Sequence, residues 1–241
     1  YRSMSTVSWA YPEGLREAYY PYDNTAYRDK IRAEFDLAVD DGYLTKDAKG
    51  KYLYKGKPLK LTFTISGDTQ DHPAYQVLYN AAEVLNNNFG TDITVKTDIS
   101  ALKRLATGSL QVWAAAWSST VDPDMYQVYH EDSKATSVWN WGYREILDDP
   151  NATLFSYERG IIDVLSRYIE EARTTLDQNS RAETYELALE EVMKLCVEIP
   201  TYQRKNLFVF NKNVIDADSL LTSNDSESVK QVTPYQDPMS R

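Results

Sequence analysis

Two polar, aromatic stretches of the sequence carry the residue types that recognise organic molecules. Residues 117–124 (WSSTVDPD) place an indole ring, three hydroxyls and two carboxylates within eight residues. Residues 139–143 (WNWGY) place three aromatic rings around an amide and a glycine. Aromatic faces stack on a ligand while polar groups fix its orientation, so this mixture is typical of a binding surface. The candidate ligand-binding residues are Trp117, Ser118, Ser119, Thr120, Asp122, Trp139, Asn140, Trp141 and Tyr143.

The two carboxylates of the first stretch, Asp122 and Asp124, admit three interpretations. Asp122 can cap a helix that has Pro123 at its first position. It can instead contact a ligand directly. The pair can also act as general acid and base, or as the carboxylates of a metal-dependent sugar transferase. The spacing alone leaves all three open.

Composition and motifs exclude several other classes of protein. The net charge of −10 would repel phosphate backbones, which disfavours nucleic-acid binding. The two histidines, His72 and His130, lie far apart, and no metal-ligand spacing or phosphate-binding glycine loop occurs. We therefore expect no metal site and no cofactor. A single cysteine, Cys196, cannot form an internal disulfide, and no apolar run approaches the ~20 residues that span a bilayer.

The middle of the chain predicts the scaffold that positions these residues. Apolar and polar residues alternate over 59–66 and again over 93–96, which indicates two strands. A helix from about residue 73 to Phe89 lies between them, closed by Gly90. A short helix over 100–107 leads to the apolar run 110–117, the signature of a central strand buried on both faces. This β-α-β-α-β order predicts parallel strands with right-handed crossovers.

The carboxyl ends of such strands are where an open α/β sheet binds ligands. That rule selects two turns, residues 66–69 (SGDT) after the first strand and residues 117–124 after the third. The rest of the chain supplies flanking elements. They are an irregular lead-in over 1–22, a helix ending near Asp40, a hairpin over 45–57, helices over 157–176 and from Ser180, extended pieces over 199–203 and 207–210, and a loosely held tail from 219.

The second long helix has two features of its own. Ser180 and Glu183 form a capping box at its start. Tyr185, Leu189, Val192 and Cys196 follow at steps of four, three and four, which predicts an inner stripe with Cys196 buried.

Three segments together resemble the C-terminal half of extracellular solute-binding proteins. They are AAAWSSTVDPDMYQVYH (114–130), SVWNWGY (137–143) and EIPTYQRKNLFVFNKNV (198–214), with TPYQDPMSR (233–241) similar to the end of such proteins. The resemblance is to family 5, the oligopeptide/dipeptide receptors of ABC importers. It covers residues 20 to 241 and implies one lobe of a type II periplasmic binding protein, an α/β fold with a mixed sheet.

The resemblance also implies an organisation and a setting. Residues 1–200 would form the second lobe and residues 201–241 a returning hinge strand and tail, with the first lobe of the same chain missing. The implied partners are an oligopeptide or other small organic ligand and the membrane permease of an ABC importer. The implied location is extracytoplasmic, periplasmic or lipid-anchored at the cell surface. No signal region is present in this sequence.

One position departs from the family pattern. The family commonly has Trp-x-x-Asp-Tyr-x-x-Pro at the turn after the third strand, and its Asp holds the amino terminus of the peptide. Here Thr120 and Val121 occupy the Asp and Tyr positions. Either Asp122 substitutes for that Asp, or the ligand is not an ordinary peptide.

The leading interpretation is thus a non-catalytic binding lobe. The alternative is a carbohydrate-active or sugar-transferring α/β enzyme that uses Asp122 and Asp124, and a third possibility is an interaction scaffold. A binding role predicts that Trp117, Asp122, Trp139, Trp141 and Tyr143 are partly exposed in this lobe.

Overall fold

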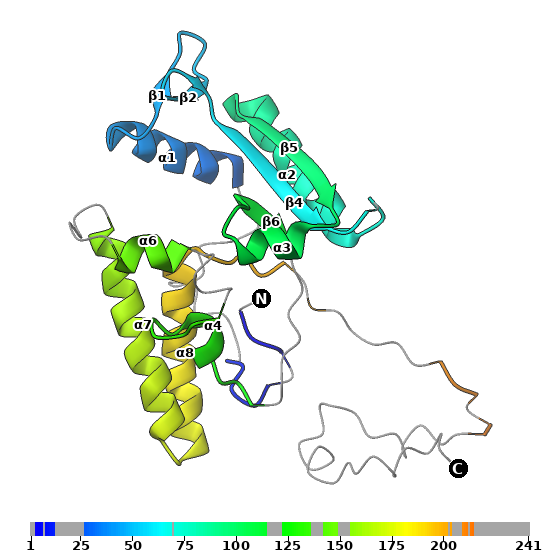
Figure 1. Cartoon of the computed structure of the whole chain (residues 1–241), viewed down its shortest axis with the longest axis vertical. Helices are drawn as coiled ribbons and strands as arrows, with labels where there is room; N and C mark the ends of the chain where they lie inside the picture. The colour runs from blue at the N-terminus through cyan, green and yellow to red at the C-terminus, as the bar shows by residue number, and fades with distance from the viewer. Residues whose placement is uncertain are drawn as a thin grey trace.

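The structure is a computed structural model (Figure 1). It describes residues 3–6, 8–12, 27–68, 70–114, 122–135, 142–148, 155–201, 203, 209–211 and 213–214. Every structural statement below concerns these residues. They form a sheet part, from α1 to β6, and a helical part, from α4 to α8 (Figure 1).

The sheet part contains the predicted β-α-β-α-β unit. Strands β4 (Lys60–Ser66), β5 (Asp92–Asp98) and β6 (Val112–Ala114) are parallel, and their order in the sheet is β5-β4-β6. The expectation that the third strand is central is wrong within this sheet: β4 is central, and the residues of β6 are only half-buried. A short apolar run does not reveal the order of strands.

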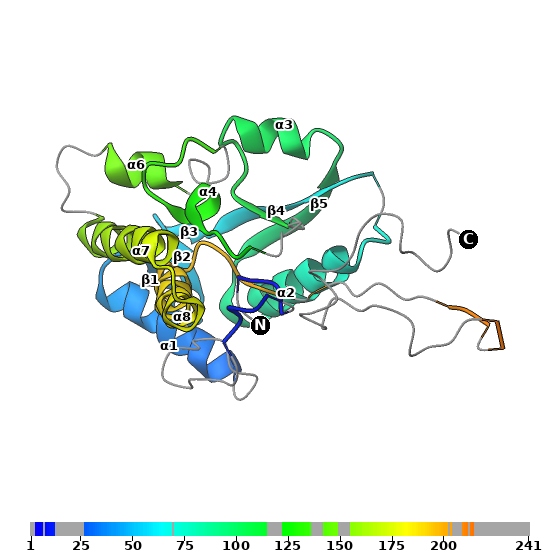
Figure 2. The ribbon, with the colours of Figure 1, turned by 90° about the horizontal axis from the view of Figure 1, so that it is seen from below.

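The two connecting helices cover opposite faces of the sheet (Figure 2). Helix α2 (Pro73–Phe89) joins β4 to β5. Helix α3 (Ala101–Ala106) joins β5 to β6, the strand that lies on the other side of β4. Right-handed crossovers that step in opposite directions must place their helices on opposite faces. Under α2, Phe63, Ala82 and Ile93 form a small buried cluster.

The boundaries of α2 follow from local chemistry. Pro73 occupies its first turn, and the Nδ1 atom of His72 accepts the N–H of Ala74 at 3.1 Å. At the other end Gly90 adopts a left-handed conformation, φ 78°, and its N–H bonds the carbonyl of Asn86. Both ends were predicted from the sequence.

Helix α1 (Tyr27–Asp40) and a small antiparallel sheet complete this part. The mini-sheet consists of β1 (Thr45–Lys46), β2 (Tyr52–Tyr54) and β3 (Lys57–Pro58) in that order, so the predicted hairpin has a third short strand. Tyr52 and Phe89 are fully buried there, and Phe35 of α1 stacks on Phe89 at a centroid distance of 5.2 Å. These aromatic contacts attach the mini-sheet to the end of α2.

The helical part is built on an antiparallel pair, α7 (Ser156–Thr174) and α8 (Gln178–Leu195). Two short helices, α4 (Tyr126–Tyr129) and α6 (Arg144–Leu147), pack against α7. The core between α7 and α8 is shielded from solvent because their apolar residues recur at three- and four-residue steps. Its members at 0% exposure are Leu165, Ile169, Ala172, Tyr185, Ala188, Leu189 and Val192.

Two predictions about α8 need correction. Its N-cap is Asp177, whose carboxylate accepts the N–H and the hydroxyl of Ser180, both at 2.8 Å, so the helix begins before the expected capping box. Cys196 is exposed at the C-cap with φ 54°, because the helix ends before the residue can join the inner stripe. Tyr185, Leu189 and Val192 are buried as predicted.

The segment after α8 belongs to no helix or hydrogen-bonded strand at the described positions 197–201, 203 and 209–211, so any extended pieces there pair with no other strand at those positions. The tail from residue 219 lies outside the described residues. Within the described part of the chain, no helix has the length and apolar character needed to cross a bilayer.

Candidate functional site

The carboxyl ends of the three parallel strands lie at one edge of the sheet. Ser66 at the end of β4 is in register with Asp98 at the end of β5, and Ala114 of β6 pairs with Ile65. Ala114, the last residue of β6, therefore lies near the end of β4. We call this side the ligand edge: residues 66–68, Asp98 and Ala114. Most of the predicted second turn, residues 117–121, lies outside the described residues.

Gly67 shapes the first turn of the ligand edge. Its φ of 129° belongs to a region that side chains disfavour, and its N–H donates to the carbonyl of Asp98 at 3.3 Å. No other atom lies within 4 Å of the place where a Cβ would stand. The glycine is therefore required by backbone conformation and not by crowding.

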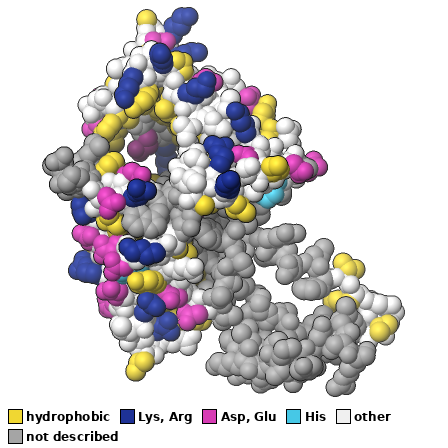
Figure 3. Space-filling model, in the orientation of Figure 1, with side chains coloured by type: hydrophobic (Ala, Val, Ile, Leu, Met, Phe, Trp, Pro, Cys, Tyr) yellow, Lys and Arg dark blue, Asp and Glu magenta, His cyan; other side chains and the backbone are white. Residues whose placement is uncertain are grey.

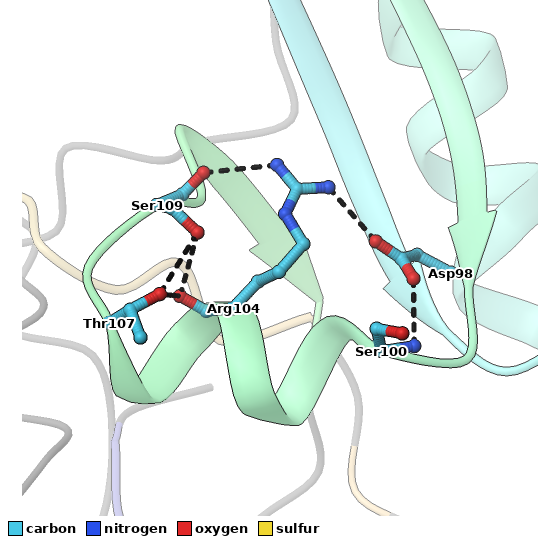
Figure 4. A network of polar contacts seen from close by, with 5 residues as sticks. All are labelled: Asp98, Ser100, Arg104, Thr107 and Ser109. Carbon is cyan, nitrogen blue, oxygen red and sulfur yellow. Dashed lines mark hydrogen bonds and ion pairs between the residues drawn. The ribbon is translucent and has the colours of Figure 1, made fainter.

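A polar network braces the same edge next to Asp98 (Figure 4). The guanidinium of Arg104 donates to the Asp98 carboxylate at 2.9 Å and to the carbonyl of Ser109 at 3.0 Å. The Ser100 N–H donates to the other oxygen of Asp98 at 2.7 Å. The hydrogen bond from Arg104 and the one from Ser100 lower the pKa of Asp98, which stays ionised. Arg104 thus ties α3 to the end of β5 and to the loop before β6.

Sequence reasoning missed this network. An Asp that directly follows a strand, with an Arg on the next helix, was available as a signal for it. The six-residue separation gave no helical or strand periodicity that would pair the two side chains. Their contact depends on how α3 turns back from β5.

Asp122 is exposed and pairs with Arg181 of α8, with 3.6 Å between Oδ1 and Nη2. Arg181 also donates to the carbonyl of Ala172 at 2.9 Å and lies over the ring of Trp9 at 5.1 Å. No helix begins at Pro123, because α4 starts at Tyr126, so Asp122 is not a helix cap. Its ion pair links Asp122 to the first turn of α8.

Asp124 pairs with a different arginine. Its Oδ2 lies 3.3 Å from Nε of Arg173 on α7, and its Oδ1 accepts the N–H of Tyr126 at 2.9 Å. Arg173 in turn lies over the ring of Tyr126 at 4.4 Å. Asp124 thus bonds the N–H of the first residue of α4, whose N-cap position is Met125.

These contacts bear on the enzymatic alternative. A carboxyl that acts as general acid needs a pocket that excludes water. The side chains of Asp122 and Asp124 are 65% and 42% exposed, and each is occupied by its own guanidinium. The arrangement favours a structural use of the two carboxylates.

The expected partial exposure of Tyr143 is wrong. Its ring is 1% exposed, in a cluster with Ile146 and Ile162, and its hydroxyl donates to the carbonyl of Tyr129 at 3.1 Å. Burial raises the pKa of this phenol far above its ordinary value. The residue packs into the helical core because a large aromatic ring beside α6 stabilises more by burial than by exposure.

The other candidates divide between described and undescribed positions. Of the nine candidate residues, Asp122 and Tyr143 are described, and the structure does not bring them together as one polar surface. The remaining seven lie outside the described residues: Trp117, Ser118, Ser119, Thr120, Trp139, Asn140 and Trp141. Among the described residues, no group of three His, Cys, Asp or Glu side chains is arranged to hold a metal ion.

No known family model and no curated protein sequence matches this chain. Its fold, however, is similar to several solved structures. The oligopeptide-binding protein AppA from Bacillus subtilis, solved with a nonapeptide, matches with a TM-score of 0.58 and 14% identity, over 81% of this chain and 34% of AppA. NikZ from Campylobacter jejuni, solved with Ni(L-His), matches with a TM-score of 0.54 and 14% identity, over 82% and 35%.

A third similar structure is DppA from Helicobacter pylori, an ABC transporter-associated periplasmic binding protein solved with the peptide STSA. Its TM-score is 0.53 and its identity 17%, over 81% of this chain and 31% of DppA. The chain thus spans about a third of the length of these proteins. A parallel α/β sheet flanked by helices, matched over four-fifths of the chain, gives this protein the fold of type II periplasmic binding proteins.

Proposed function

We propose that this chain is the ligand-binding second lobe of the solute-binding protein of an ABC importer. Residues 1–200 form the lobe, and residues 201–241 are the returning hinge strand and tail. The first lobe would complete the cleft. The likeness to about a third of AppA, NikZ and DppA supports a partial rather than a whole receptor.

One observation carries this proposal: the carboxyl ends of β4, β5 and β6 lie at one edge of the sheet, and polar residues follow β4 and β6 in the sequence. The turn at 66–68 is held by the Gly67 hydrogen bond, and Arg104 braces the end of β5. The indole and hydroxyl groups of residues 117–120 follow β6 directly. Small ligands bind at this edge of open α/β sheets.

The proposed ligand is an oligopeptide or a similarly small organic molecule. The similar structures were solved with a nonapeptide, a tetrapeptide and a nickel–histidine complex, which share amino and carboxylate groups. Thr120 lacks the charge to bind an ammonium group, and Asp122 is engaged by Arg181. We therefore propose that Trp117 and the hydroxyls beside it bind the ligand, with no catalytic step.

The proposal has consequences for setting and partners. A receptor of this kind works outside the cytoplasm, in the periplasm or at the cell surface on a lipid anchor, and delivers its ligand to a membrane permease. The net charge of −10 argues against nucleic acid as a partner.

The test uses the full-length protein purified from its source, with native mass spectrometry to identify a co-purified ligand. Calorimetry then compares the wild type with Trp117→Ala, and with Tyr157→Ala as the control, since Tyr157 is an exposed ring on α7. We expect Trp117→Ala to weaken binding about tenfold or more and the control to leave it unchanged. The isolated lobe should bind no peptide more tightly than about 1 mM.

Two results would contradict the proposal. One is micromolar peptide binding by the isolated lobe, because half of a cleft should not suffice. The other is a Trp117→Ala protein that loses stability but keeps its affinity, which would place the indole in the core.

A further inference from the structure

The lysines of the chain are concentrated on the mini-sheet and the start of β4. Residues 45–60 contain six lysines and one aspartate, in a chain whose net charge is −10. Figure 3 shows several Lys and Arg side chains at the upper end of the molecule, where β1 and β2 are labelled in Figure 1, and others elsewhere on this face. All six lysines are exposed. A basic surface on an otherwise acidic protein attracts negatively charged partners to that region.

Three of these lysines line an open groove of about 500 Å³. We call it the lysine groove: its lining includes Tyr54, Lys55, Lys57, Lys60, Leu61 and Gln111. The lysines supply positive charge, while Tyr54 and Leu61 supply apolar contact area. Such a mixture binds a segment that carries both carboxylates and apolar side chains.

The charges of the groove are weakly satisfied by the protein itself. Lys60 lies 3.7 Å from Asp92, and both side chains are more than half exposed. Lys55 lies over the ring of Tyr54 at 5.0 Å. Within the described part of the chain, neither Lys55 nor Lys57 has a carboxylate at ion-pair distance. The groove therefore presents positive charge to a partner.

The backbone at Lys55 adds an independent observation. Lys55 and Gly56 join β2 to β3 with φ values of 49° and 75°, the two positive values of a type I′ hairpin turn. Asn or Gly is strongly preferred at the first of these positions, and a lysine there costs stability. Backbone strain of this kind gathers at functional sites. A charged side chain held in that conformation points to a binding role for Lys55.

The groove also lies beside the first residues of β4, which β6 does not pair with. The pairing of β6 with β4 starts at Phe63, and beyond it the side chain of Gln111 accepts the Thr62 N–H at 2.8 Å. The main chain of β4 before Thr62 thus runs past the start of β6. An extended segment fits along such an edge. The groove is at the amino end of β4, opposite the ligand edge.

We propose that the lysine groove is a docking site for an acidic, extended segment of a partner protein. A groove lined by an aromatic ring and lysines suits an extended peptide better than a flat membrane surface. Because the groove and the ligand edge are at opposite ends of β4, docking would leave the ligand edge accessible. This inference does not depend on the identity of the ligand.

The test uses the full-length protein and a fluorescein-labelled decapeptide of alternating glutamate and leucine, followed by fluorescence anisotropy. The key variant is Lys55→Asn, which removes a charge and relieves the turn. The second variant is the triple change Lys55→Glu, Lys57→Glu and Lys60→Glu. The control changes Lys49, Lys96 and Lys103 to Glu, which alters the net charge equally on exposed lysines outside the groove.

We expect Lys55→Asn to melt at a higher temperature yet to bind the peptide severalfold more weakly. The triple groove variant should lose about tenfold or more in affinity, and the control less than about twofold. Raising the salt concentration from about 50 mM to 300 mM should weaken binding severalfold. A decapeptide with lysine in place of glutamate should not bind.

Three outcomes would overturn the proposal. They are no binding of the acidic peptide, an equal loss in groove and control variants, and tighter association with phosphatidylglycerol vesicles than with the peptide. The second outcome would mean unspecific attraction, and the third would mean a lipid surface as the partner. Circular dichroism of each variant confirms that a loss of binding is not a loss of fold.

Discussion

The helical and sheet parts of the molecule bury their apolar residues to different degrees. The α7–α8 pair encloses seven residues at 0% exposure, whereas the cluster under α2 consists of Phe63, Ala82 and Ile93, at 4–7%. The residues of β6 are all half-buried. The sheet part also holds the fully buried Tyr52 and Phe89 beside α1, so the contrast lies between the α7–α8 pair and the layer under α2, which encloses fewer buried residues.

The largest expected effect is a loss of stability in the helical core. Leu165→Ala removes a side chain at 0% exposure and should lower the free energy of unfolding by about 2–5 kcal/mol. Leu61→Ala on β4 removes a half-buried leucine and should cost about 1 kcal/mol. Denaturant unfolding of both variants measures the difference. Equal losses would mean that the two parts are equally well packed, and the comparison would fail.

A smaller effect is expected at Tyr143, which the sequence assigned to ligand binding and the structure places in the core. Tyr143→Phe removes the hydroxyl that bonds the Tyr129 carbonyl and should cost about 1 kcal/mol. Ligand affinity of the full-length protein should not change. Tyr157→Phe, with an exposed ring, is the matched control and should change neither quantity. If Tyr143→Phe weakened ligand affinity and left the free energy of unfolding unchanged, Tyr143 would belong to the ligand-binding site after all.

The smallest effect concerns pH and the brace at the ligand edge. The pKa of Asp98 is lowered from its usual 3.8 by Arg104 and the Ser100 N–H. A carboxyl with a lowered native pKa stabilises the fold above its unfolded pKa, and that contribution is lost as the pH falls below about 3.8. Asp98→Asn should therefore lower the melting temperature slightly near neutral pH, and the gap to wild type should close in acid.

The control for this prediction is Asp41→Asn, an exposed position after α1. Thermal melts followed by circular dichroism at about pH 7 and about pH 2 give the comparison. A gap of the same size at both pH values would show that the Asp98 charge does not stabilise the ligand edge.

Much of the sheet part could be predicted from sequence because its signals are local. The alternation of apolar and polar residues predicted where β4 and β5 lie in the sequence. His72, Pro73 and Gly90 indicated the two ends of α2. The order β5-β4-β6 was not predictable, because an apolar run is compatible with an edge as well as a centre. Pairing between strands depends on contacts that are distant in sequence.

The candidate site was harder for the same reason. The carboxylates at 122 and 124 looked like a ligand or catalytic pair because their neighbours in sequence are polar. Their partners, Arg181 and Arg173, belong to helices 59 and 49 residues further along the chain, and no local pattern connects them. Tyr143 was predicted to be partly exposed because it lies in a polar, aromatic stretch of sequence. It is buried because the residues beside α6 pack against the helical core.

The left-handed end of α8 has a practical consequence. The sequence contains one cysteine, and Cys196 is exposed there, with φ 54°, where the chain turns away from the helical part. A maleimide dye or spin label would attach at this single thiol of the sequence without any engineered residue. The label would sit at the junction between the helical part and the segment that follows it. Such a label would report, by spectroscopy, on movement of the chain at the end of α8.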